Sequence, residues 1–235
     1  IKVDQIFETE RPAFVIHLAA QAGVRHSINN PHDYINSNIV GFQNVIENCR
    51  KFSVNHFLYA SSSSVYGLNE KIPFSENHIT DSPANLYGAT KKSNELVAFC
   101  YSHLYSLPTT GLRFFTVYGP WGRPDMAYFN FTKNIIENKP IKIYGNGNMY
   151  RDFTYVDDVV SAILKLINTI PSKSNKNEKK LVPAEIYNIG NNNPEHLENF
   201  IKIIEDTTKS KAIRNYMPMQ MGDIFKTCAN IDKLK

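Results

Sequence analysis

The chain is poor in cysteine and has no long apolar run, and each scarcity excludes a class of protein. Its cysteines, Cys49, Cys100 and Cys228, are odd in number, widely spaced and without a Cys-x-x-Cys pair. We therefore expect a reduced, cytoplasmic setting in which the thiols are small core residues. No apolar run approaches the roughly 20 residues that a membrane-spanning helix requires, and no signal peptide is recognisable, so we predict no membrane partner.

Clusters of a single charge are also missing. The 26 Lys and Arg residues exceed the 22 Asp and Glu residues by a net charge of only +4, and part of that excess lies in the polar stretch 171–180, which we interpret as a solvated loop. No stretch interleaves basic and aromatic residues, so we predict no nucleic-acid partner. The histidines lack His-x-His or His-Glu-x-x-His spacing, and we expect no metal site.

Strand-like and helix-like segments alternate along the first half of the chain. Short apolar runs at 13–18, 56–60 and 110–115 predict strands, the first of them a central strand covered on both faces. Helical periodicity predicts helices at 1–9, 33–50 and 84–105. This alternation without tandem hairpins indicates a parallel α/β sheet, and the three strand ends, rich in small or hydroxylic residues, predict one shared crevice.

The apolar positions of the long helices predict which faces are buried. In the helix 84–105 we expect Leu96, Val97, Cys100, Tyr101 and Leu104 to face inward. After Pro120 the pattern predicts helices near 128–138 and 196–206, a helix after Asp157 and Asp158, and strands at 140–145 and 185–190. Residues 145–148, Gly-Asn-Gly-Asn, lack the third glycine of a phosphate-binding fingerprint, and we interpret them as a turn.

The chemistry suggested by the sequence centres on Tyr87 and Lys91, which stand four residues apart on one helix face. A free phenol has a pKa of about 10, and a nearby ammonium favours its ionised form, which could accept a proton. A serine run, Ser61 to Ser64, ends the strand upstream and could share that proton. Taken alone, Tyr-x-x-x-Lys also occurs by chance on protein surfaces. The serine run and the small residues after position 17 favour a catalytic site.

Several further motifs accompany this set, and together they span most of the chain. They are HLAAQAGVRHS at 17–27, Asn38, YASSSSVYG at 59–67, YGATK at 87–91, LRFFTVYGPWGRPDMA at 112–127, YGNG at 144–147, RDFTYVDD at 151–158, YNIG at 187–190 and PMQMGD at 218–223. With these motifs the chain resembles the extended short-chain dehydrogenase/reductases and, within them, the NAD-dependent epimerase/dehydratase family. Inside that family it looks most similar to UDP-glucuronate 4-epimerases.

The resemblance implies a fold and a domain division. It implies an α/β protein with a partial Rossmann-like, doubly wound parallel sheet and a smaller substrate-binding α/β domain. Residues 1–120 would be the later part of an NAD-binding domain, and residues 121–235 a nucleotide-sugar-binding domain from which some chain returns to the first. The glycine-rich turn with which the family begins is not found, so we expect a fragment of a longer protein that would not bind NAD tightly by itself.

The resemblance also implies roles for individual residues. Tyr87, Lys91, Ser62 and Ser64 would be catalytic. The residues implied to contact NAD are Leu18, Ala19, Ala20, Gln21, Asn38, Ala60, Ser61, Tyr87, Lys91 and Phe115. Those implied to contact a UDP-sugar are Ser63, Thr116, Arg123, Tyr144, Arg151, Gln220 and Asp223.

Within the UDP-sugar set, Arg123 with Thr116 and a serine would hold an acidic sugar's carboxylate, because a guanidinium matches that planar acceptor. Tyr144 would stack on uracil, and Arg151 would contact the diphosphate. Each has a plainer interpretation: a surface loop for Arg123, strand packing for Tyr144, an ion pair with Asp152 or Asp157 for Arg151.

The implied reaction is oxidation of the sugar at C4 by hydride transfer to NAD, turning of the 4-keto intermediate, and return of the hydride to the opposite face. Dehydratases and decarboxylases of the family carry acidic residues in the serine run, whereas this chain has none there. The alternatives are another UDP-sugar epimerase or dehydratase, or a truncated product without catalytic activity. The resemblance further implies a homodimer formed through the helices at 34–50 and 84–105.

Overall fold

The computed structural model describes residues 2–172 and 182–235. Ile1 and positions 173–180 of the predicted loop 171–180 lie outside the described residues.

Four parallel strands form the main sheet, in the order β1 (Phe14–His17), β2 (His56–Ser62), β3 (Thr109–Phe114) and β7 (Ala184–Ile189). This confirms the predicted parallel sheet and its strands. The prediction that the first strand is central was wrong for the described residues, because β1 pairs with β2 only. Phe14 and Ile16 on this edge each remain 39% exposed.

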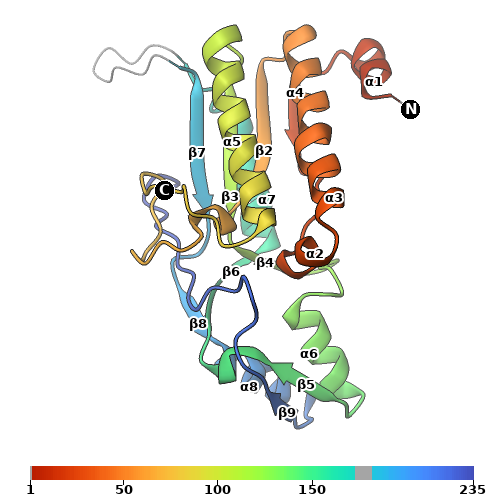
Figure 1. Cartoon of the computed structure of the whole chain (residues 1–235), viewed down its shortest axis with the longest axis vertical. Helices are drawn as coiled ribbons and strands as arrows, with labels where there is room; N and C mark the ends of the chain where they lie inside the picture. The colour runs from red at the N-terminus through yellow and green to blue at the C-terminus, as the bar shows by residue number, and fades with distance from the viewer. Residues whose placement is uncertain (1, 173–181) are drawn as a thin grey trace.

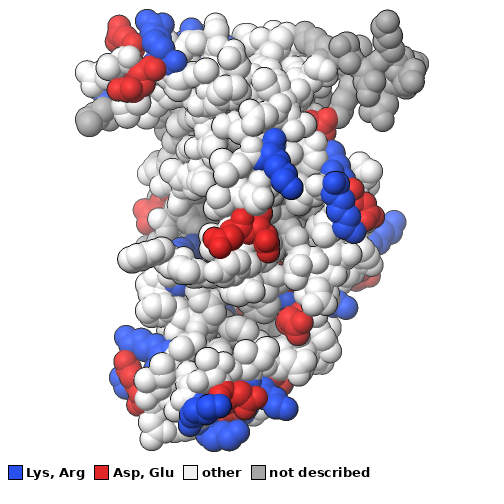
Figure 2. All heavy atoms as spheres, turned by 180° about the vertical axis from the view of Figure 1, so that it is seen from behind, with Lys and Arg blue, Asp and Glu red and all other residues white. Residues whose placement is uncertain are grey.

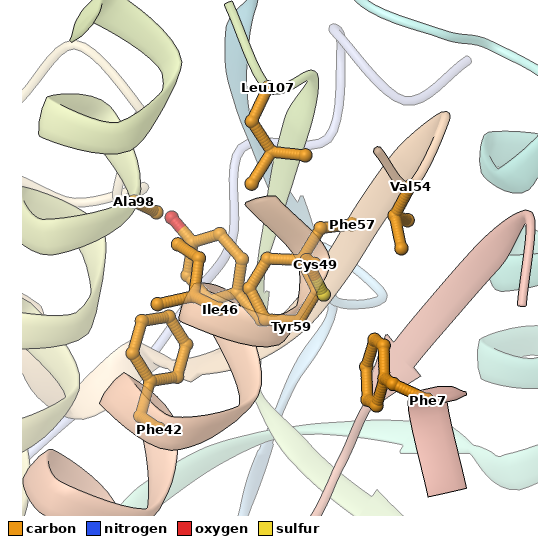
Figure 3. Packing of buried hydrophobic residues seen from close by; sticks show 9 residues of the cluster. All are labelled: Phe7, Phe42, Ile46, Cys49, Val54, Phe57, Tyr59, Ala98 and Leu107. Atoms are coloured by element: carbon orange, nitrogen blue, oxygen red, sulfur yellow. The ribbon is translucent and has the colours of Figure 1, made fainter. Parts of the chain in front are cut away.

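Helices cover both faces of the sheet (Figure 1). α4 (Gly41–Lys51) and α5 (Leu86–Tyr105) lie on one face, and α7 (Val156–Ile167) lies on the other. The alternation of side chains along β2 divides the core between the two faces. Phe57 and Tyr59 pack against Phe42 and Ile46 of α4, as Figure 3 shows, whereas Leu58 packs with the inner residues of α7. The doubly wound α/β arrangement is thereby confirmed.

The buried face of α5 differs from the one predicted. Leu96 is 56% exposed, Leu104 is 66% exposed and Cys100 is also exposed, so the expected inward stripe was wrong at these positions. The helix instead buries polar and small residues. These are Gly88, Thr90, Lys91, Asn94, Glu95, Ala98 and Ser102. The error arises because apolar periodicity cannot detect a helix face whose buried polar groups are hydrogen-bonded inside the protein. Cys49 and Cys228 are buried, as predicted.

The helix predicted at 33–50 is interrupted. It comprises α3 (Pro31–Tyr34), a π-helical segment η1 (Ile35–Val40) and α4. Single π-helical turns inside helices are frequent at functional sites. The buried residue of η1 is Asn38, which is 1% exposed.

The rest of the chain forms two small sheets below the main one (Figure 1). β4 (Thr116–Tyr118), β6 (Tyr150–Tyr155) and β8 (Pro194–His196) form one, and β5 (Pro140–Ile143) pairs with β9 (Ile213–Tyr216) in the other. α6 (Ala127–Ile136) and α8 (Leu197–Thr208) pack beside them, and the apolar residues Leu197, Phe200, Ile201 and Ile204 of α8 belong to their shared core. The predicted turn at 145–148 overlaps the short η3 (Tyr144–Gly147), in which Gly145 and Asn146 have positive φ.

Short elements complete the described chain. α1 (Val3–Glu10) precedes β1, α2 (Val24–Asn29) follows it, and η2 (Ser63–Tyr66) follows β2. Among the described residues no helix is both long and apolar enough to cross a membrane. On the face shown in Figure 2, basic and acidic side chains lie interspersed. The boundary predicted at residue 120 stays a prediction.

Candidate active site

The N-terminus of α5 lies close to η2, the short segment that follows β2. The side chain of Asn85 caps the helix by accepting a hydrogen bond of 2.8 Å from the Gly88 backbone N–H. A Cβ atom on Gly88 would lie 2.6 Å from the backbone oxygen of Ser64, which is closer than packed atoms permit. Glycine at this position therefore allows the first turn of the helix to contact the serine run directly.

This close contact brings the predicted catalytic groups together. Tyr87 and Ser62 line the same cavity, and the Ser62 side chain acts on the Tyr87 phenol. Lys91, only 3% exposed, donates a hydrogen bond of 2.8 Å from Nζ to the backbone oxygen of Ala60. The Ser62 hydroxyl also accepts a hydrogen bond of 3.1 Å from the Ser64 backbone N–H. The structure brings Tyr87, Lys91 and Ser62 together in one cavity, and their catalytic role stays a prediction.

The electrostatics of Tyr87 differ from the prediction. Burial raises the pKa of Tyr87, while the Ser62 side chain and the positive charge of Arg123 oppose that rise. Arg123 thus supplies positive charge that favours the phenolate, while the Lys91 ammonium donates to the Ala60 backbone oxygen. Burial lowers the pKa of Lys91 to about 8. Burial and the charge of Lys91 lower the pKa of His17 to about 4, so this imidazole stays neutral beside the ammonium.

Asn38 connects the loop after β1 to α5. Its carboxamide accepts a hydrogen bond of 2.8 Å from the Gln21 backbone N–H and donates one of 3.0 Å to the Gln21 backbone oxygen. It also donates one of 3.0 Å to the Thr90 hydroxyl, three residues beyond Tyr87. Asn38 therefore fixes the loop 18–21 relative to the helix that carries Tyr87 and Lys91.

Two adjoining cavities form a continuous cleft at the carboxyl ends of the strands. The first, of about 630 Å³, contains Tyr87, Lys91 and Ser61 to Ser64. The second, of about 490 Å³, lies between the main sheet and the small sheets and contains Tyr144. Thr116, Arg123, Arg151 and Asp223 line both cavities. This size and position are typical of a small-molecule site in an α/β protein.

Most of the predicted site residues line this cleft. Besides those named above, the predicted residues Leu18, Ala20, Ala60 and Phe115 line it. Four predicted residues do not line it: Ala19, Gln21, Asn38 and Gln220. Asn38 and Gln21 lie behind the residues that line the cleft and are hydrogen-bonded to each other. The Gln220 Oε1 atom is buried without a hydrogen-bond partner among the described residues.

A group of charged residues that the sequence reasoning only partly identified surrounds Tyr144. The Arg25 guanidinium lies 4.7 Å from the centre of the Tyr144 ring and 3.8 Å from the Asp223 carboxylate. Arg151 donates hydrogen bonds to the backbone oxygens of Tyr150 and Phe225, rather than forming the ion pair with Asp152 or Asp157 considered above. Arg25, in α2, was missed because a single arginine carries no signal of its own in the sequence.

Arg123 lies at the junction of the two cavities. Its side chain is 44% exposed and contacts Asp125 at 3.1 Å, and Thr116 lines the same part of the cleft. Its positive charge also acts on Tyr87, as described above. The arrangement places a guanidinium between the phenol and the charged cavity, where it could meet an acidic ligand group. In the described part of the chain, no three His, Cys, Asp or Glu side chains gather as a metal-binding group.

The contacts of Asn38 lead to a prediction. Asn38→Ala removes the partners of two backbone groups of Gln21 and should lower the free energy of unfolding by about 1–3 kcal/mol, the cost of buried unpaired polar groups. It should also weaken cofactor binding, because the loop 18–21 is no longer fixed. Thermal unfolding and calorimetric titration with NAD, on protein expressed from the full reading frame, measure both effects.

Asn48→Ala is the matched control. Asn48 is a buried asparagine on α4, and its side chain bonds to Asp4 and to the Asn44 backbone oxygen, away from the cleft. It should lower stability without changing NAD affinity. Equal effects of the two substitutions on NAD affinity would contradict the role given to Asn38.

Comparison with known proteins agrees with this geometry. The family model described as NAD dependent epimerase/dehydratase matches residues 1–190. Protein CapI of Staphylococcus aureus is 54% identical over 99% of this chain, which spans 72% of that relative. A probable UDP-glucuronate 4-epimerase of Rhizobium meliloti is 47% identical over 99% of this chain, which spans 71% of that relative.

Solved structures show the same similarity. The UDP-glucuronic acid 4-epimerase of Bacillus cereus, in complex with UDP-glucuronic acid and NAD, superposes with a TM-score of 0.88 at 31% identity. The match covers 100% of this chain and 71% of that structure. On the extent of the family match and on these identities, the chain belongs to the NAD dependent epimerase/dehydratase family.

Proposed function

We propose that this protein interconverts the C4 epimers of a UDP-sugar with the help of NAD, and that its substrate is UDP-glucuronate. The observation that carries the proposal is that Tyr87, Lys91 and Ser62 line one cleft, which continues into a cavity lined by arginines. The relatives named as UDP-glucuronate 4-epimerases support the same activity.

The residues of the first cavity fit a nicotinamide nucleotide. Leu18 is 53% exposed and offers an apolar surface, and Ala20 next to it leaves room for a flat ring. Lys91 uses one of its three donors on Ala60 and could use another on a ribose hydroxyl. NAD bound here would accept a hydride from the sugar and return it. We propose that Leu18 to Gln21, Ala60, Ser61, Lys91 and Phe115 form this part of the site, with Asn38 supporting it from behind.

Tyr87 would take the proton from the C4 hydroxyl as the hydride leaves and give it back when the hydride returns. The Ser62 hydroxyl could share that proton, since it lines the same cavity and acts on the phenol. Because burial raises the pKa of Tyr87, the phenol needs positive charge nearby to act as a base near neutral pH. Arg123 supplies part of that charge, and Ser63 and Ser64 line the same wall.

The absence of acidic residues in the serine run favours epimerisation over elimination. Elimination of water from a keto sugar requires a group that donates a proton to the leaving hydroxyl. Ser61 to Ser64 supply hydroxyl groups only, and among the described residues no carboxylate lines the first cavity except that of Asp223, which also borders the second. The cleft can therefore move a hydride and one proton but is poorly equipped to expel a hydroxyl group.

The charged second cavity suits the nucleotide and the acid of UDP-glucuronate. Tyr144 offers a ring for stacking on uracil, and Arg151, with Arg25 next to it, offers cations for the diphosphate. Arg123 and Thr116 lie where the sugar would pass from one cavity to the other and would hold its carboxylate. Asp223 would contact the uridine side, and Gln220 could do so only after its side chain moves.

Tyr87→Phe tests the mechanism. It removes the proton acceptor while keeping the ring, so kcat should fall by about 10²- to 10⁴-fold, the usual contribution of a positioned acid or base. Binding of UDP should be unchanged. The interconversion of UDP-glucuronate and UDP-galacturonate is followed chromatographically in protein expressed from the full reading frame.

Two outcomes would contradict the mechanism and the function, respectively. Wild-type activity in Tyr87→Phe would remove Tyr87 from the reaction. A decarboxylated pentose or a 6-deoxy sugar as the product, with no C4 epimer, would exclude 4-epimerisation as the function.

Arg123→Gln tests the choice of an acidic sugar. Loss of a hydrogen-bonded guanidinium from a carboxylate site should lower kcat/KM for UDP-glucuronate by about 10- to 100-fold, consistent with about 1.5–3 kcal/mol for a charged hydrogen bond. Activity on UDP-glucose, if measurable, should fall less. If kcat/KM falls equally for both sugars, Arg123 acts on the nucleotide or on Tyr87. The proposal of an acidic substrate would then be contradicted.

The exposed apolar residues of α5 support the proposal of a homodimer. Leu96, Phe99 and Leu104 are 53 to 66% exposed, and α4 lies beside α5 on the same face of the sheet (Figure 1). A second copy could cover this face by pairing the same helices about a twofold axis.

Charge introduced into this face should prevent assembly. Phe99→Glu should sediment as a monomer because a carboxylate would be buried without a partner. Ile203→Glu, at a position of α8 that is 61% exposed, is the control and should leave the assembly state unchanged. A wild-type protein that sediments as a monomer at micromolar concentration would refute the dimer.

A further inference from the structure

A buried ion pair lies directly behind the candidate active site. Glu95 of α5 and Arg113 of β3 are bonded through two parallel contacts, Nε to Oε1 at 2.8 Å and Nη2 to Oε2 at 2.9 Å. Their side chains are 5% and 4% exposed. Neither residue lines the cleft, and the mechanism above gives neither a role.

The same carboxylate is bonded to the serine run. The Ser61 hydroxyl donates a hydrogen bond of 2.6 Å to Glu95 Oε1. Ser61 and Arg113 are direct neighbours in the register of β2 and β3. One carboxylate therefore joins α5 to both strands, at the residue immediately before Ser62.

The network continues to Tyr66, just beyond the other end of the serine run. Arg113 Nη1 donates a hydrogen bond of 3.0 Å to the Tyr66 hydroxyl, and its guanidinium lies 4.9 Å from the Tyr66 ring centre. The Tyr66 hydroxyl donates in turn to Asn188 of β7 at 2.6 Å. Ser62, Ser63 and Ser64 lie between Ser61 and Tyr66 in the chain. The network therefore holds the chain on both sides of these three serines, which would face the substrate.

Glu95 extends a regular series along α5. Tyr87, Lys91 and Glu95 follow at intervals of four residues on one helix face. They contact three consecutive residues of β2: Tyr87 with Ser62, Lys91 with Ala60, and Glu95 with Ser61. A shift of α5 relative to β2 would change all three contacts together.

A buried ion pair is an inefficient way to gain stability. The desolvation of two charges costs several kcal/mol, and apolar residues of similar volume often stabilise a protein equally or better. The two parallel hydrogen bonds of a guanidinium and a carboxylate do, however, fix distance and direction more strictly than apolar packing. The ion pair is therefore better explained by the fixed distance and direction that it imposes than by a gain in the stability of the protein.

We propose that Glu95, through its ion pair with Arg113 and its hydrogen bond with Ser61, is a positioning residue that sets the distance between the Tyr87 phenol and the Ser62 hydroxyl. The inference rests on the proposed function and adds to it a residue outside the cleft. Loss of the carboxylate removes neither Tyr87 nor Ser62 but releases the end of β2 from α5, so that the two side chains are no longer held at a fixed distance.

The test compares three single variants in protein expressed from the full reading frame. Glu95→Gln keeps the shape but removes the charge that pairs with Arg113. Ser61→Ala removes the hydrogen bond from β2 to Glu95 and keeps the ion pair of Glu95 with Arg113. Glu205→Gln is the matched control, because Glu205 is also 5% exposed and forms two contacts with Arg214, at 2.9 and 3.2 Å, away from the cleft.

Catalytic constants should separate positioning from stability. In Glu95→Gln, kcat for the sugar epimerisation should fall by about 10- to 100-fold, the effect of misplacing a catalytic group by roughly 1 Å, with KM changed by less than about threefold. In Ser61→Ala the fall should be about 2- to 10-fold, as for one hydrogen bond. Glu205→Gln should lower the melting temperature without lowering kcat.

Hydrogen exchange provides a readout that needs no activity. Backbone amides of residues 57–68 should exchange faster in Glu95→Gln and Ser61→Ala than in the wild type or in Glu205→Gln, because the end of β2 opens more readily. The same peptides should be unchanged in Glu205→Gln.

The two hypotheses fail in different ways. A wild-type protein without 4-epimerase activity on any UDP-sugar overturns the proposed function, and hydrogen exchange still decides whether Glu95 holds the serine run. A Glu95→Gln variant with wild-type kcat and wild-type exchange at 57–68 overturns the positioning role. Should Glu95→Gln fail to fold, unchanged kcat and exchange in Ser61→Ala overturn it instead.

Discussion

The contact between the start of α5 and the end of β2 is the constraint on which the site depends. Two backbones approach there more closely than a side chain on Gly88 would permit. Close approach of a helix to a strand end leaves little room for water, so every polar group between them must find a partner in the protein. Ser62, Ala60 and Ser61 supply those partners to Tyr87, Lys91 and Glu95. The polar groups that hold the helix in place are largely the groups that the proposed reaction would use.

The cleft combines a poorly solvated region with a charged one. Around Tyr87 and Lys91, burial shifts both pKa values toward the neutral forms of the groups. Around Tyr144, by contrast, Arg25, Arg151 and Asp223 interact electrostatically in a cavity open to ligands. An anionic nucleotide bound in the charged region would bring its sugar toward the phenol, with Arg123 at the boundary. This division suits a reaction in which binding energy comes from the nucleotide and the chemistry is confined to the sugar.

The strands, their parallel arrangement and the residues at their carboxyl ends could be predicted from the sequence. These features depend on local apolar runs and on motifs. Tyr87, Lys91 and Ser62 could be found in this way, since four-residue spacing and the end of a strand are visible in one dimension. The buried face of α5 could not, because Glu95 and Ser102 look solvent-exposed until Arg113 and Thr109 are known to lie opposite. The π-helical segment that turns Asn38 inward, and the place of Arg25 beside Tyr144, likewise depend on contacts between distant residues.

The central claim is that this cleft removes and returns the hydrogen at C4 of a UDP-sugar. The most direct measurement uses UDP-glucuronate deuterated at C4, incubated with protein expressed from the full reading frame and NAD, with the product examined by NMR. The product should be UDP-galacturonate that retains deuterium at C4, gains no solvent hydrogen at C5, and forms without net consumption of NAD. Loss of the C4 label to solvent, or exchange at C5, would contradict the claim.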